Sequence, residues 1–179
     1  MGNAIAMFEG NRAPDFRTPQ SFIDYLKEKW YLEFDLDAAA DRHNKKAKHY
    51  FSIEDDALSQ DWFGKVWLNP PYGRGIENWL EKCAEQIQRK QVESIHVLVP
   101  ARTDTKWFHE IVMPHAYNVY LIKGRFNFDH HTTVKGKNAP FPSMLILYRK
   151  HFGYTPQHLS LIHYLFLLKI LFSSDFFQL

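Results

Sequence analysis

The chain has 179 residues, 45% of them hydrophobic and 16% aromatic, and a formal net charge of +2. This length and composition fit a globular protein with one core of ordinary size. Because the net charge is small, a nucleic-acid partner requires a local cluster of basic residues. The lone cysteine, Cys83, excludes an internal disulfide framework and a cysteine-rich zinc site, and its helical surroundings place it in the core.

The first residues lack the charged start and long apolar run of a signal peptide, so a cytoplasmic protein is expected. Residues 1–17 are mixed in character and are expected to form a loose arm. Thr18-Pro19-Gln20 then predicts a helix start, since threonine is a good N-cap and proline suits the first turn. That helix has an apolar face made by Phe22, Ile23, Tyr25, Leu26 and Trp30.

Residues 32–37 alternate apolar and charged side chains, which is typical of a strand, and run into Ala38-Ala39-Ala40. Small residues directly after a strand let a ligand approach the backbone. Asp37, at the strand end, is placed to bind a ligand's ammonium or hydroxyl group. A plain strand-to-helix turn explains these residues equally well, because no Gly-x-Gly occurs here.

Two charged stretches follow this strand. Residues 41–50 are basic; solvated surface explains such a run, and phosphate contact is the alternative that the neighbouring aromatic residues favour. Residues 54–56 are acidic. They form either a solvated turn or a source of acceptors for a ribose hydroxyl or an adenine amine.

The most informative stretch is Val66-Trp67-Leu68-Asn69-Pro70-Pro71-Tyr72. Its apolar start predicts the end of a buried strand, and the two prolines force the chain out of the sheet. Asn69 is therefore expected at the carboxyl end of a strand, where open α/β sheets bind ligands. The Asn69 amide and the Pro70 carbonyl are two acceptors that can bind an –NH2 group, and Tyr72 can stack on the base or amide that carries it. A simple strand-ending turn is the alternative.

The remaining elements are predicted from periodicity: helices at 76–91 and 106–112, and strands at 94–99, 117–122 and 143–148. His96 is expected to be a packed core histidine. Residues 129–142 are expected to form a binding loop, since the connection is unusually long, but its adjacent histidines alone do not make a metal site. Strands that alternate with helices predict an α/β layer with a largely parallel sheet.

Residues 159–172 form an apolar run that His163 and Lys169 interrupt, too short for a membrane span. A helix packed on the domain, a dimer contact and an interfacial helix are the alternatives. We expect no stable membrane association, and the sequence predicts no particular oligomeric state. The chain is divided into an arm (1–17), a domain (18–150) and an apolar extension (151–179).

In this order, the residues resemble the phage-type DNA N-6-adenine methyltransferases, which use S-adenosylmethionine. The resemblance runs from about Thr18 to about Tyr148. Its marks are Thr18-Pro19-Gln20, Asp35-Leu36-Asp37-Ala38-Ala39, Asp56-Ala57-Leu58 with Trp62, Val66 to Tyr72, Leu98-Val99-Pro100-Ala101 with Asp104 and Trp107-Phe108, Gly124-Arg125-Phe126, and Pro140-Phe141-Pro142-Ser143. It implies a Rossmann-like methyltransferase fold, with a mostly parallel central sheet flanked by helices.

The resemblance also implies the site. Thr18 and Pro19 would lie near the methionine end of S-adenosylmethionine, Asp37 and Ala38 would replace its glycine-rich motif, and Asp56 would hold its adenine amine. The glycine pair that usually follows the first strand is missing here. The catalytic residues would be Asn69, Pro70, Pro71 and Tyr72, and no metal is required.

The implied reaction is methyl transfer from S-adenosylmethionine to the exocyclic amine of adenine in double-stranded DNA. The resemblance also implies that a phage or prophage encodes the enzyme and that it acts in the cytoplasm of a bacterial host. Candidates for DNA backbone contact are Arg74, Arg102, Arg125, Lys135 and Lys137. An amino methyltransferase that acts on RNA or protein glutamine is one alternative. A catalytically inactive DNA-binding module is the other.

Overall fold

A six-stranded sheet forms the centre of the molecule. The structure is a computed structural model, and it describes residues 16–129 and 139–150. The strand order is β2-β1-β3-β4-β6-β5. The strands are β1 (Leu36–Asp37), β2 (His49–Tyr50), β3 (Gly64–Leu68), β4 (Val92–Pro100), β5 (Asn118–Leu121) and β6 (Ser143–Arg149), and the helices are α2 (Gln20–Trp30), α3 (Ile76–Gln86) and α4 (Met113–His115).

Strand directions confirm the predicted mostly parallel sheet. β1 pairs in parallel with β2 and with β3, and β3 pairs in parallel with β4. β6 is antiparallel to both β4 and β5, so β5 again runs in the direction of β4. Among the described strands, only β6 is reversed.

The strand order reverses at β1, because the strands that follow β1 in the chain lie on opposite sides of it. From β1 the chain moves outward to β2, and it then returns to place β3 on the other side of β1. In open α/β sheets, ligands bind outside the carboxyl ends of the strands at such a switch point. β1 ends at Asp37 and β3 ends at Leu68, so Asp37 and Asn69 flank this position.

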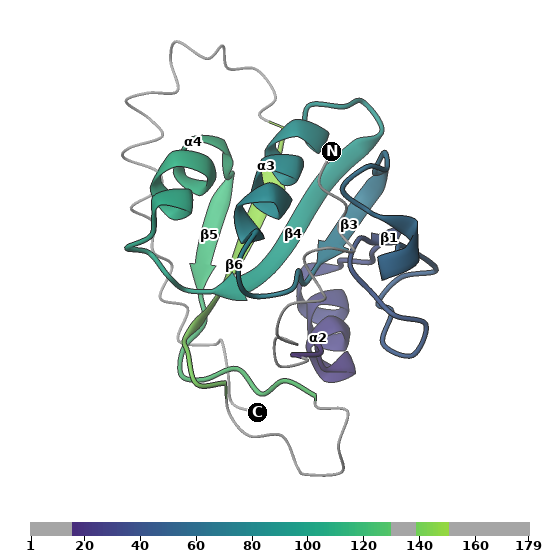
Figure 1. The fold of residues 1–179 in the computed structure, drawn as a ribbon. Coiled ribbons are helices and arrows are strands. Elements are labelled where there is room, and N and C mark those ends of the chain that lie inside the picture. The colour runs from purple at the N-terminus through teal and green to yellow at the C-terminus, as the bar shows by residue number, and fades with distance from the viewer. Residues whose placement is uncertain (1–15, 130–138, 151–179) are drawn as a thin grey trace.

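Both faces of the sheet are covered, because alternate residues of the buried strands point to opposite sides. On one face Val66, Leu68 and Val97 pack with α3 and with residues 107–112, and on the other Trp67 and Leu98 pack with α2. Figure 1 shows α3 and α4 on the same face of the sheet, with α2 apart from them. The predicted α/β fold is confirmed, and Cys83 and His96 are buried as expected.

Several element boundaries differ from the predictions. The first strand is two residues long, because the Asp35 side chain replaces a ladder partner: its Oδ2 accepts a hydrogen bond from the Lys65 amide at 2.8 Å. Helix α2 has Pro19 at its N-cap, so Thr18 is not the cap. Helix α3 ends at Gln86, and the predicted helix at 106–112 is a π-helical turn, Phe108–Val112, that leads into α4.

The predicted loose arm, residues 1–17, includes two residues that the structure describes. Phe16 and Arg17 are part of the described structure, and Arg17 forms an antiparallel bridge with Asp129. Residues 1–15, 130–138 and 151–179 lie outside the described residues, and so do the expectations made for them.

Candidate active site

Asn69 directly follows β3, and both ends of its side-chain amide are hydrogen-bonded. Nδ2 donates to the backbone carbonyl of Phe16 at 2.6 Å, and Oδ1 accepts from the Tyr72 hydroxyl at 2.7 Å. A carbonyl oxygen can only accept, so the group that faces Phe16 has to be the NH2 group. The orientation of the Asn69 amide therefore follows from its partners.

Tyr72 is held by its hydroxyl and by its ring. The hydroxyl also lies 3.2 Å from the Leu98 carbonyl oxygen, and burial raises its pKa well above the usual value, so it stays a hydrogen-bond donor. The ring stacks on Phe16, with centroids 5.6 Å apart and 28° between planes, and meets Phe128 and Phe141 edge-on. The ring that the sequence predicts to stack on a base or amide is thus packed against three phenylalanine rings in the structure.

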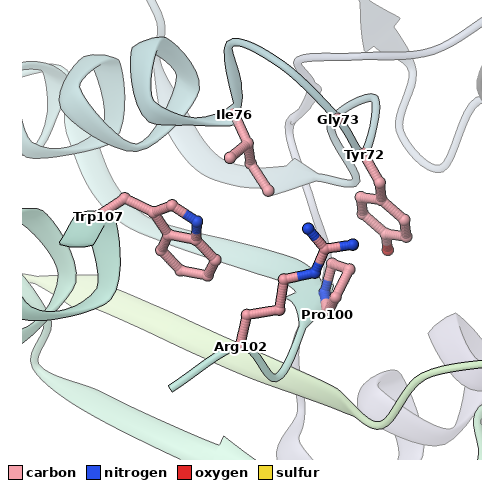
Figure 2. Close-up of a pocket in the computed structure, with 6 residues that line it drawn as sticks. All are labelled: Tyr72, Gly73, Ile76, Pro100, Arg102 and Trp107. Carbon is pink, nitrogen blue, oxygen red and sulfur yellow. The ribbon is translucent and has the colours of Figure 1, made fainter. Parts of the chain in front are cut away.

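Tyr72 also lines a small hollow at the carboxyl ends of β3 and β4. Figure 2 shows the Arg102 guanidinium pointing into it, between Trp107 and Tyr72, with Ile76 above. Its volume is about 10 Å³, which holds one water at most. A base that stacks on Tyr72 must therefore move neighbouring side chains.

Asp37 lies on the β1 side of the switch point and is 2% exposed. Its Oδ2 accepts from the Lys46 amide at 2.8 Å and its Oδ1 from the Ala39 amide at 3.3 Å. Burial raises the pKa of this carboxyl to about 6, although the two amides act in the opposite direction. Ala38 is fully buried, and its amide donates to the Trp67 carbonyl of β3 at 2.9 Å, so β1 and β3 stay paired up to the site.

Two of the predicted cofactor residues carry a buried oxygen that has no hydrogen-bond partner: Thr18 Oγ1 and Asp56 Oδ1. Both belong to segments that reach the same edge of the sheet. Arg17, beside Thr18, forms an ion pair with Asp41 after β1, at 2.9 Å, and Asp56 follows β2 in a left-handed conformation with φ 49°. Because a buried polar atom without a partner costs about 1–3 kcal/mol, these oxygens fit a polar ligand.

Arg74, Arg102 and Arg125 are exposed and follow the carboxyl ends of β3, β4 and β5. These three strands run in the same direction, so the structure places the arginines along the edge that holds Asn69. Lys135 and Lys137 lie outside the described residues.

The structure brings two residues to the site for which the sequence predicts no role there, although one of them, Ser143, is a mark of the family resemblance. Phe16 falls within the predicted loose arm, although an aromatic residue so close to Thr18-Pro19 is a usable signal. Ser143, opposite Pro100 at the end of β4, has a buried hydroxyl without a partner. Only strand pairing, which the sequence does not reveal, brings Ser143 to this edge.

A family model described as DNA N-6-adenine-methyltransferase (Dam) matches residues 10–164, which is most of the chain. The chain belongs to this Dam family. The family resemblance predicted from the ordered motifs is therefore confirmed, and the match includes the complete Asn69 to Tyr72 stretch.

Two curated relatives of this Dam-family chain are both named DNA N-6-adenine-methyltransferase. The protein of Escherichia phage T1 is 38% identical over 111 residues, which cover 58% of this chain and 44% of the phage protein. The protein of Haemophilus phage HP1 (strain HP1c1) is 29% identical over 133 residues, which cover 73% of this chain and 76% of that protein. The chain thus spans less than half the length of the phage T1 relative.

Solved structures give more distant similarities. A Pyrococcus horikoshii protein whose suggested activity is RNA methylation matches with a TM-score of 0.49 and 15% identity, over 83% of this chain and 96% of that protein. A Thermoplasma acidophilum protein matches with a TM-score of 0.45 and 14% identity, over 85% of this chain and all of that protein. The fold of the Dam-family chain, an α/β fold with a mostly parallel sheet, is therefore assigned from its own strand order and strand directions.

Within residues 16–129 and 139–150, no helix combines the length and the apolar character that a membrane crossing requires. In the same residues, no three histidine, cysteine or acidic side chains gather as metal ligands would.

Proposed function

We propose that the chain transfers a methyl group from S-adenosylmethionine to the exocyclic amine of adenine in double-stranded DNA. The observation that carries the proposal is the oriented amide of Asn69, at the switch point of a Dam-family chain. The names of both phage relatives agree with this reaction.

Asn69 and Pro70 would bind the amine. Its lone pair is delocalised into the purine ring, which makes the amine a poor nucleophile. If its two hydrogens are accepted by Asn69 Oδ1 and the Pro70 carbonyl, the nitrogen becomes more tetrahedral and its lone pair is free to attack. Positioning and electrostatics then supply most of the rate. Tyr72 donates to Asn69 Oδ1 at 2.7 Å and would stack on the base once it has left the duplex.

The cofactor-binding residues would be Thr18, Pro19, Asp37, Ala38 and Asp56. The unpartnered oxygens of Thr18 and Asp56 support this assignment, and the ionised Asp37 carboxylate favours a cationic ligand. S-adenosylmethionine supplies a methyl group that its sulfonium already activates, so no covalent intermediate with the chain is needed. The setting that we propose is the cytoplasm of a bacterial host, in line with the phage origin of both relatives.

The test is transfer of a labelled methyl group to unmethylated duplex DNA, followed by nucleoside analysis. We expect label in N-6-methyladenine. Asn69→Ala should lower kcat at least about a hundredfold, the order seen when one preorganised polar group is removed, while cofactor affinity stays within about twofold. Asn118→Ala, at the start of β5 and the opposite edge of the sheet, is the matched control and should keep full activity.

Each other result contradicts part of the proposal. Label in RNA or protein, with none in DNA, would assign another amino substrate. No cofactor binding in calorimetry would indicate a binding module. Full activity of Asn69→Ala would refute the mechanism.

A further inference from the structure

Phe16 contacts the catalytic motif through its backbone and its side chain. Its carbonyl oxygen accepts a hydrogen bond from Asn69 Nδ2 at 2.6 Å, slightly shorter than the 2.7 Å bond between Asn69 Oδ1 and the Tyr72 hydroxyl. Its ring stacks on Tyr72, the residue that holds the other end of the same amide. Phe16 therefore lies against both side chains that the proposed reaction uses.

The segment that carries Phe16 is fixed on several sides. The Arg17 amide donates to the Asp129 carbonyl at 3.2 Å, and the Asp129 amide donates to the Arg17 carbonyl at 2.9 Å. The Arg17 guanidinium pairs with Asp41 at 2.9 Å. The Phe16 ring also lies 5.2 Å from Phe128 and 5.0 Å from Phe141, between centroids. These contacts hold the Phe16 carbonyl at a defined place beside Asn69.

This placement decides which end of the Asn69 amide is available. The terminal torsion of an asparagine is broad and roughly two-fold, so a free amide presents its oxygen or its nitrogen almost equally. Rotating the amide by half a turn here would set its oxygen against the Phe16 carbonyl oxygen and replace the part-buried 2.6 Å hydrogen bond by a repulsion between two acceptors, which is costly. Oδ1 is therefore kept on the side of Tyr72, where it has a second lone pair for a substrate amine.

We propose that Phe16 is a positioning residue for methyl transfer, and that its aromatic ring anchors the carbonyl that orients Asn69. The inference rests on the proposed function and extends it to a residue outside the catalytic stretch. A carbonyl cannot be removed by substitution, but its anchor can.

The first experiment compares Phe16→Ala with Phe16→Tyr and Phe141→Ala. We expect Phe16→Ala to lower kcat at least about tenfold, since misplacement of a catalytic group by about an ångström has effects of this order, with the KM for DNA and the cofactor Kd within about twofold. Phe16→Tyr keeps the ring and should restore kcat. Phe141 meets the rings of Phe16 and Tyr72 edge-on and supplies only one of the contacts that hold the Phe16 ring, so Phe141→Ala should lower kcat less than Phe16→Ala does, by less than about threefold.

The second readout does not depend on activity. In protein labelled with ¹⁵N-asparagine, the Asn69 side-chain amide is assigned by its absence in Asn69→Ala. Its hydrogen exchange should be slow in the wild type and in Phe141→Ala, and faster in Phe16→Ala. If Phe16→Ala does not fold, Phe16→Leu serves for both measurements.

Unchanged kcat and unchanged amide exchange in Phe16→Ala would overturn the proposal. Tighter DNA binding or faster transfer would also overturn it, because the ring would then obstruct the Tyr72 face. If the wild type methylates no DNA, the proposed function fails, and amide exchange alone decides whether Phe16 orients Asn69.

Discussion

The Asp37 carboxyl group is almost completely buried from solvent, and it lies next to the place where we propose that a cation binds. Its pKa in the fold is about 6, against an ordinary value of 3.8, because burial disfavours the charged form. Between these two values the folded chain holds a proton that the unfolded chain has lost. The stability that this carboxyl contributes is therefore complete below about pH 4 and is lost as the pH rises through 6.

The same ionisation should affect cofactor affinity in the opposite direction, so that affinity rises as the pH rises. Only the charged carboxylate attracts a cation, so S-adenosylmethionine should bind about tenfold more weakly at pH 5 than well above pH 6, by the protonated fraction at a pKa of about 6. Calorimetry from pH 5 to pH 8 measures this. Asp37→Asn should bind weakly at every pH, and Asp61→Asn, an exposed acid paired with Arg89, should keep the wild-type profile. A flat wild-type profile would show that Asp37 does not face the cofactor.

At the scale of the element, Gly64 determines how β3 begins. Its φ is +63°, a left-handed conformation that L side chains rarely adopt. A Cβ at this position would collide with the Asp35 carboxylate, which accepts from the Lys65 amide at 2.8 Å. The turn into the strand that carries Asn69 thus depends on the absence of a side chain.

Gly64→Ala should lower the free energy of unfolding by about 3 kcal/mol, from left-handed strain of about 1–2 kcal/mol and loss of a charged hydrogen bond. Urea unfolding measures the change. Gly124→Ala is the matched control: its φ is +80°, but nothing lies within 4 Å of the added Cβ. It should cost only the strain. Equal losses in the two variants would mean that Asp35 moves aside without cost.

Elements whose own pattern decides their structure could be predicted from the sequence. Examples are the apolar runs of β4 and β6 and the helical spacing of α2 and α3. The proline pair after β3, which keeps the chain from continuing in the sheet, is another. Elements that depend on distant partners could not. The Asp35 side chain shortens β1 through a contact 30 residues away, and the hydrogen bond between Phe16 and Asn69 spans 53 residues. Local periodicity contains no information on such pairs.

At the scale of the whole molecule, the two edges of the sheet carry different groups. The carboxyl edge holds Asn69, and Arg74, Arg102 and Arg125 follow it in successive loops. Ion pairs of the described residues include none of these three arginines. At the amino edge, a hollow of about 530 Å³ is lined by four cationic residues: Lys65, Lys90, Arg149 and Lys150. Both edges thus carry several cations, but only the carboxyl edge holds the candidate active site.

If DNA lies across the carboxyl edge, its affinity should depend on the first set of cations. Each phosphate contact contributes about 0.9 to the slope of log K against log salt concentration for duplex DNA. Replacing Arg74, Arg102 and Arg125 together by glutamine should therefore lower this slope by about 2 to 3. Fluorescence anisotropy of a labelled duplex, titrated at several salt concentrations, measures the slope.

The amino edge supplies a control with the same change in net charge. Replacing Lys65, Lys90 and Arg149 by glutamine removes three positive charges from the opposite edge, so the slope should stay within about 0.5 of the wild type if only direct phosphate contacts count. Equal effects of the two triple variants would mean that DNA responds to net charge alone. A larger effect of the amino-edge variant would place the duplex away from Asn69. Only a loss confined to the carboxyl edge agrees with a base that leaves the duplex beside Tyr72.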